Sequence, residues 1–121
     1  MRFACVDTST FTESVALVEG DTLWGERNVR RPYGHAPGLH ADLRALLQEV
    51  DWPLESLDAL VIGVGPGSFT GLRVGMAAMK GLAYALEKPL YGVNTAKALL
   101  AALADMRESL ALIDARRGEL Y

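Results

Sequence analysis

The alternation of apolar and polar residues over the first thirty positions predicts three strands. Residues 3–6, 14–18 and 22–29 form short apolar or alternating runs, and turn-forming residues at 7–10 and 19–21 separate them. Strands joined by such short connections pair antiparallel. The N-terminal quarter is therefore predicted to be a three-stranded meander.

After a Pro- and Gly-containing break at 32–38, the pattern changes to helices that alternate with buried strands. Leucines recur at helical spacing over 39–50, on one face. Further helices are predicted at 71–86 and 95–106, and further strands at 60–64, 90–93 and 110–113. Because a crossover helix makes consecutive strands parallel, the expected fold is α/β, with a mixed five-stranded sheet and flanking helices.

The helix predicted over 71–86 has almost no polar face. Its only charged residues are Arg73 and Lys80, with Tyr84 as a weaker polar group. A glycine inside a helix costs about 1 kcal/mol relative to alanine, so Gly75 suggests that another backbone approaches closely. A sheet covers only one side of a helix, so we expect a partner helix on the other. The alternative cover is the 32–38 connection or a further lobe.

A glycine-rich loop connects the strand at 60–64 to this helix. A helix start leaves N–H groups free for an anion. The loop does not match a phosphate-binding loop, which needs lysine where Leu72 stands, or a dinucleotide fingerprint, which needs glycine at Thr70. Structural glycines in a tight turn remain the alternative. The candidate anion or nucleotide loop comprises Asp7, Thr8, Ser9, Gly65, Gly67, Ser68 and Gly71.

The composition of the chain limits the classes of function that it could have. The chain has 121 residues, 12 basic and 15 acidic, for a net charge of −3, so no strong field attracts nucleic acid. The single cysteine, Cys5, fits a reducing compartment, and no apolar stretch is long enough to cross a membrane. We expect a cytoplasmic protein. Residues 110–121 read as a strand, a turn and the start of a returning strand, which suggests the N-terminal lobe of a longer protein.

Three segments carry a resemblance to a known family. Residues 65–75, Gly-Pro-Gly-Ser-Phe-Thr-Gly-Leu-Arg-Val-Gly, are followed by Met-Lys-Gly-Leu-Ala at 79–83. With Asp-Thr-Ser-Thr at 7–10 and the segment 113–121, they are similar to the signature of the TsaB (YeaZ) family. The resemblance covers residues 1–121.

That resemblance implies a ribonuclease-H-like lobe of the actin and sugar-kinase superfamily, followed in family members by a second lobe. It implies a non-catalytic subunit that supports a catalytic paralogue, TsaD, and further subunits in forming N6-threonylcarbamoyladenosine at position 37 of tRNA. In the family, the first two helices form a bundle with those of TsaD or of a second copy, so a homodimer is expected when the chain is alone. The expected interface is apolar and comprises Leu39, Leu43, Leu46, Leu47, Leu72, Val74, Gly75, Met76 and Met79.

No metal site is expected. TsaD carries a His-x-x-x-His pair, whereas His35 and His40 are five residues apart and do not share a helical face. Two other activities remain open as alternatives. Asp7 and Asp114 both end predicted strands and could bind Mg²⁺ beside a nucleotide, as in an actin-like ATPase. ATP or ADP with magnesium is then expected only with the second lobe or a partner.

A glycoprotease-type metallopeptidase is the third hypothesis. The chain offers no paired metal ligands for it, and neither Ser68 nor Cys5 has a base beside it in the sequence. We therefore expect no catalytic residues.

Overall fold

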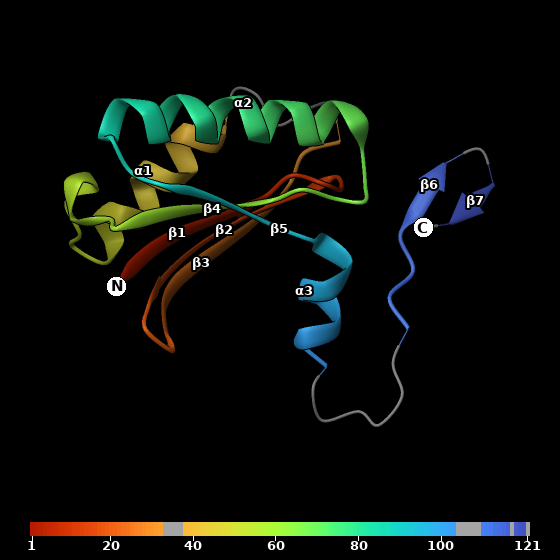
Figure 1. Ribbon diagram of the computed structural model, residues 1–121, viewed down its shortest axis with the longest axis horizontal. Coiled ribbons are helices and arrows are strands. Elements are labelled where there is room, and N and C mark those ends of the chain that lie inside the picture. Colours follow the sequence, from red (N-terminus) through yellow and green to blue (C-terminus); the bar gives the residue numbers. More distant parts are fainter. Residues whose placement is uncertain (33–37, 104–109, 117, 121) are drawn as a thin grey trace.

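The computed structural model describes residues 1–32, 38–103, 110–116 and 118–120. The elements run in the order β1 (Arg2–Asp7), β2 (Thr12–Glu19), β3 (Thr22–Arg30), α1 (Leu39–Glu49), the 3₁₀ turn η1 (Leu54–Ser56), β4 (Ala59–Gly63), α2 (Phe69–Leu86), β5 (Leu90–Val93), α3 (Thr95–Ala101), β6 (Asp114–Arg116) and β7 (Glu119–Leu120) (Figure 1).

The first five strands form one mixed sheet in the order β3-β2-β1-β4-β5. β1 pairs antiparallel with β2, and β2 with β3, whereas β1–β4 and β4–β5 are parallel. The predicted meander and the mixed five-stranded sheet are thus confirmed. The parallel pairs bring the C-terminal ends of β1, β4 and β5 to the same edge.

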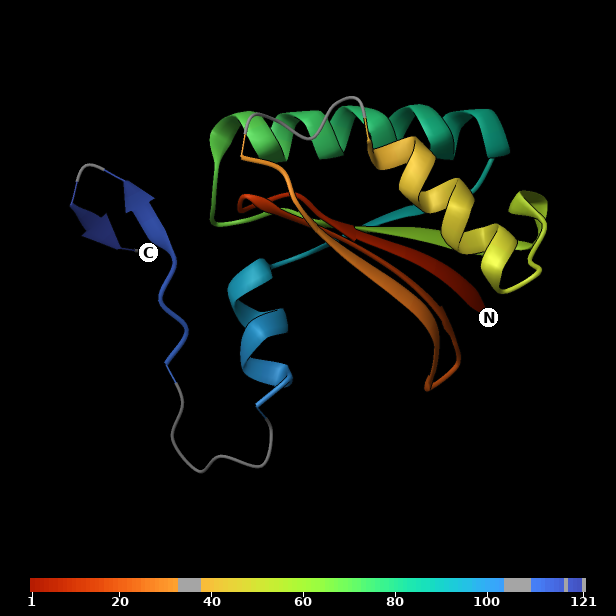
Figure 2. The same cartoon turned by 180° about the vertical axis from the view of Figure 1, so that it is seen from behind.

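Helices α1 and α2 cover one face of this sheet, and α3 lies on the opposite side (Figure 2). The core forms between α1, α2 and the sheet. The strands contribute alternate residues, such as Val15 and Leu17 of β2, and α1 contributes a leucine stripe. Among the described residues, no helix is both long and apolar enough to cross a membrane.

The prediction of a last strand over residues 110–113 is wrong. Residues 110–113 are not a strand, and Leu110 is 78% exposed. The short pairing that follows, β6 with β7, is a separate two-stranded sheet. The outer edge of β5 is unpaired in the described sheet, but the chain leaves the sheet at α3 and residues 110–113 do not pair with that edge. Helix α3 ends at Ala101, before the predicted 106, and residues 104–109 lie outside the described range.

Candidate functional site

The candidate loop residues meet at the edge where β1, β4 and β5 end. Asp7 is the last residue of β1, and both oxygens of its carboxylate accept hydrogen bonds. One oxygen, Oδ1, accepts hydrogen bonds from the backbone N–H of Ser9 at 2.8 Å and from the Ser9 hydroxyl at 2.5 Å. The other, Oδ2, accepts a 2.8 Å bond from the hydroxyl of Thr95, the first residue of α3. Asp7 therefore ties β1 to the segment that follows β5.

The N–H groups of the glycine loop are also used inside the chain. Gly65 N–H donates to the Thr95 hydroxyl at 3.2 Å, and Ser68 N–H donates to the Ser9 carbonyl at 2.7 Å. At the start of α2, the Ser68 hydroxyl accepts from Gly71 N–H at 3.2 Å, as an N-cap side chain does. A phosphate cradle needs such N–H groups to point at the ligand. Here these three stabilise the junction of the loops.

Close packing explains the glycines at this junction. A Cβ on Gly63 would overlap the Asp7 carboxylate, and a Cβ on Gly67 would overlap the backbone of Ser9. Gly65 has φ +91°, a conformation that L-residues rarely adopt. Farther along α2, a Cβ on Gly75 would overlap the hydroxyl of Thr8.

Thr8 itself is buried and donates to the Gly71 carbonyl at 2.7 Å. The predicted loop residues are thus brought together, in a cluster that closes on itself.

A cavity of about 200 Å³ lies beside this cluster on the sheet face that α1 and α2 leave uncovered. Asp7, Ser14, Asn28 and Thr95 line its polar part. Cys5 also lines it, and burial raises the pKa of this thiol. A raised pKa keeps the thiol protonated at neutral pH, so Cys5 has the properties of a packing residue and not of a nucleophile.

The residues weighed as metal or magnesium ligands are not gathered here. Asp114 belongs to the separate sheet of β6 and β7, so a shared sheet edge does not bring it to Asp7. His40 is exposed on α1, and His35 lies outside the described residues. Across the described ranges, no three His, Cys, Asp or Glu side chains are grouped as metal ligands would be.

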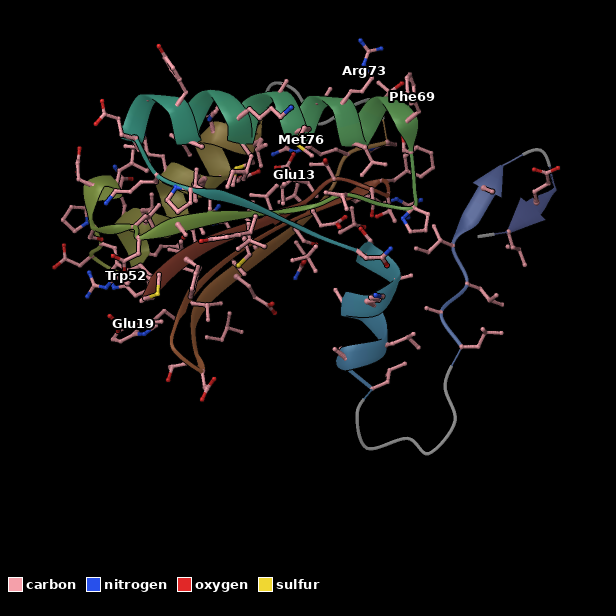
Figure 3. All side chains as sticks on the ribbon, viewed as in Figure 1. Glu13, Glu19, Trp52, Phe69, Arg73 and Met76 are labelled. Carbon is pink, nitrogen blue, oxygen red and sulfur yellow. The ribbon has the colours of Figure 1, made fainter. Side chains whose placement is uncertain are left out.

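A cluster of charged side chains, of which Glu13 is buried, joins β2 and β3 to α1, and the sequence reasoning missed it. Glu13 is 0% exposed (Figure 3). It lies 3.4 Å from the guanidinium of Arg31, which also pairs with Asp42 of α1. Arg27 of β3 lies 3.7 Å from Asp42 and pairs with Glu49. Burial, aided by the neighbouring Asp42, raises the pKa of Glu13, although Arg31 opposes this. The sequence carried one signal for the burial of Glu13: the alternation of period two in β2 places position 13 on the same face as Val15 and Leu17.

The predicted partner interface is mostly interior. Leu39, Leu43, Leu46, Leu47, Gly75 and Met79 are buried within this chain. Leu72, Val74 and Met76 are half-buried, and Met76 packs against the core. Within this chain these side chains stabilise the packing of α1 and α2 on the sheet. That they also form a partner surface stays a prediction.

Other residues of α2 form its exposed side. Phe69 is 74% exposed and Tyr84 is 89% exposed. Between them, Arg73, Ala77 and Lys80 are exposed at helical spacing. The Arg73 guanidinium lies 5.2 Å from the centre of the Phe69 ring, and Arg73 points away from the sheet (Figure 3). The exposed side of α2 thus consists of aromatic, small and basic residues, and its leucines and methionines are buried or half-buried.

A hollow lies along α1, where it is also lined by Trp52 and Leu54 and by one residue of α2, Leu82. It has a volume of about 320 Å³, and its apolar wall includes Leu43 and Leu47 of α1 and Leu82 of α2. His40, Arg44 and Gln48 of α1 form its polar rim. The same three residues line a neighbouring hollow along α1. Both hollows therefore lie along the exposed side of α1.

Comparison with known proteins places this chain in a family. The family model described as TsaD, tRNA N6-adenosine threonylcarbamoyltransferase, matches residues 34–121. The tRNA threonylcarbamoyladenosine biosynthesis protein TsaB of Bacillus subtilis (strain 168) is 31% identical over 100% of this chain and 53% of its own length. TsaB of Escherichia coli (strain K12) is 35% identical over 100% of this chain and 53% of its own length.

The solved structure of YeaZ from Pseudomonas aeruginosa is also similar. It superposes with a TM-score of 0.89 at 34% identity, and the match covers 98% of this chain and 57% of that one. The chain thus spans about half the length of these relatives. It belongs to the family that the TsaD model describes and is similar over its whole length to TsaB (YeaZ) proteins.

Proposed function

We propose that this chain is the N-terminal lobe of a non-catalytic subunit that takes part in tRNA threonylcarbamoyladenosine biosynthesis. Its role is to dock onto a TsaD-type catalytic relative, within an assembly that includes further subunits and acts on position 37 of tRNA. The observation that carries the proposal is the exposed side of α2, where Phe69 and Tyr84 flank small and basic residues.

Physical reasons favour docking at this place. Large exposed aromatic side chains on a regular helix are typical of binding surfaces, because they bury much area with little loss of conformational freedom. The helix itself is held rigidly, since Met79 and Ala83 on its inner side are part of the core. A rigid helix that presents aromatic side chains fits against another helix.

The loop cluster supports a non-catalytic role. Asp7, the candidate magnesium ligand, lines the cavity but already accepts hydrogen bonds from Ser9 and Thr95. We propose that this chain needs no cofactor of its own, and that any adenine nucleotide binds with the second lobe or the partner. Its place of action is the cytoplasm, where tRNA is modified.

Binding to the TsaD-type relative from the same organism tests the proposal. We expect a one-to-one complex, and Tyr84→Ala is expected to weaken it by about tenfold or more, as loss of an interface aromatic does. Tyr91→Ala is the matched control, because Tyr91 is also exposed but lies on β5, away from α2. Equal effects of the two substitutions, or no complex with the unmodified chain, would contradict the proposal.

A further inference from the structure

The first turn of α1 is held to the sheet by a charged side chain instead of by its own cap. The N-cap residue is Gly38, which has no side chain to accept a hydrogen bond from the turn. The guanidinium of Arg31, a residue that directly follows β3, lies against this glycine, since a Cβ on Gly38 would overlap it. The same guanidinium pairs with Asp42 in the first turn. Arg31 therefore fixes the start of the helix from outside.

Arg31 is in turn anchored to β2. Its backbone N–H donates a 2.6 Å hydrogen bond to the carbonyl of Phe11, directly before this strand. Its Nε lies 3.4 Å from the carboxyl group of Glu13, which is buried on the side of the sheet that α1 covers. One side chain thus connects β2 to α1, and the connection depends on two acidic groups, Glu13 and Asp42.

The charges of this cluster balance only when one of its carboxyl groups carries a proton. Ion pairs between described residues join two cations, Arg27 and Arg31, to three acids, Glu13, Asp42 and Glu49. Within the same ranges no further residue forms an ion pair with them. Of the three acids, Glu13 is the one with no exposed surface, and burial disfavours the charged form. Burial and the neighbouring Asp42 accordingly raise the pKa of Glu13, against the opposing effect of Arg31.

We infer that Glu13, Arg31 and Asp42 form a pH-sensitive latch that holds the first turn of α1 on the sheet. The latch is closed while Glu13 carries a proton, because a single guanidinium then balances a single carboxylate. When the proton passes to water, two carboxylates compete for Arg31 and the new charge has to be hydrated. The first turn opens to admit water, whereas Leu46 and Leu47 keep the rest of the helix in the core. This inference goes beyond the proposed function and does not rest on it.

Hydrogen exchange at the amide of Asp42 reports this opening. Its N–H donates to the Gly38 carbonyl at 2.9 Å, so it exchanges with solvent when the first turn opens. We expect its protection factor, which corrects for the intrinsic exchange rate at each pH, to fall as the pH rises above about 4.5, the ordinary pKa of a glutamate. The fall is at most about tenfold per pH unit, the limit for one proton, and it ends above the raised pKa. The Val50 amide, bonded to the Leu46 carbonyl near the other end of α1, is the internal control and is expected to change by less than about twofold.

Two substitutions of the acids separate a titrating latch from a merely structural contact. Glu13→Gln removes the titrating group and keeps the shape of the side chain, so the protection of the Asp42 amide is expected to stay at its low-pH level throughout. Asp42→Asn removes a charge that raises the pKa of Glu13, so the fall in protection at position 42 is expected to end at a lower pH. A flat profile in the unmodified chain, or a profile that still falls with pH in Glu13→Gln, would overturn the inference.

Arg31→Ala tests the cation of the latch. We expect it to lower the protection of the Asp42 amide by about tenfold or more at every pH, as loss of a charged hydrogen-bond partner does. Arg44→Ala is the matched control, because Arg44 is exposed on α1 and forms no ion pair with a described residue, and we expect a change of less than about twofold. Arg31→Lys keeps the charge without the fork that reaches both acids, and gives the same test with a milder change. An Arg31 variant that acts no more strongly than Arg44→Ala would overturn the inference, and none of these readouts involves a partner.

Discussion

The Thr95 hydroxyl donates a 2.8 Å hydrogen bond to the carboxylate of Asp7, 88 residues earlier in the chain. The same hydroxyl accepts the N–H of Gly65 at 3.2 Å. One buried side chain thereby joins the ends of β1, β4 and β5, which in the sequence are far apart. Where a nucleotide-binding lobe needs open acceptors and donors, this junction is closed by contacts between its own loops.

Thr95→Val tests the structural role of this junction. The substitution keeps the shape and removes both hydrogen bonds, which leaves the Asp7 oxygen without its donor. We expect the free energy of unfolding to fall by about 1–3 kcal/mol in chemical denaturation. Thr22→Val, at an exposed strand position, is the control and is expected to change stability by less than about 0.5 kcal/mol. Equal stability of the two variants would contradict the role assigned to Thr95.

Gly75 and Gly81, both in α2, are expected to respond in opposite ways to replacement by alanine. Gly75→Ala forces a methyl group against the Thr8 hydroxyl, and we expect a loss of about 1–3 kcal/mol, as for other overpacked sites. Gly81→Ala meets open space and is expected to gain up to about 1 kcal/mol from helix propensity. Thermal unfolding of the two isolated variants measures both. A stabilised Gly75→Ala would show that α2 does not lie on Thr8 as described.

Glu13 is expected to make the stability of the chain change with pH in the direction opposite to that of an ordinary surface carboxylate. Because burial raises the pKa of Glu13 in the folded chain, the folded state binds a proton more tightly than the unfolded one. Its contribution to stability is present below the unfolded pKa and is lost as the pH rises through the higher, folded pKa.

Glu13→Gln keeps the volume and removes this titration. We therefore expect the variant to become more stable relative to the unmodified chain as the pH rises from about 4.5 toward neutrality. Denaturant unfolding at a series of pH values measures the difference. A difference that does not change with pH, or that changes in the other direction, would contradict the raised pKa.

The leucines of α1 are expected to act on folding and not directly on partner binding. Leu46 is almost completely buried, so Leu46→Ala should reduce the free energy of unfolding by about 2–5 kcal/mol. Ala41, on the exposed side of α1, is the control position, and Ala41→Ser should change it by less than about 1 kcal/mol. Similar stability of both variants would place Leu46 at the surface instead.

The fold could be predicted from the sequence wherever a pattern reflects burial. The alternation in β2 and the leucine spacing in α1 each report which side chains face the core, and both elements formed as expected. For residues 110–113 the same reasoning predicted a strand that does not form, because an apolar run does not show which strand it would pair with.

The candidate site was only half predictable. Asp7 and the glycine loop were grouped as one candidate loop, and they do lie together. The argument from strand ends was applied to Asp7 and Asp114, and Asp114 lies in a separate sheet. The closure of the candidate loop by Thr95 depended on a side-chain orientation that spacing alone does not give. The leucine stripe of α1 looked the same whether it faced a partner or the sheet, and only the packing placed Leu39 and Leu46 in the core.

The central claim is that the exposed side of α2 binds a TsaD-type relative. The measurement that tests it most directly is the mass, in dilute solution at low salt, of this chain mixed with the TsaD-type relative of its own organism. We predict a one-to-one complex that dissociates when Tyr84 is replaced by alanine and persists when Tyr91 is. If the chain keeps its own mass in that mixture, the account is contradicted.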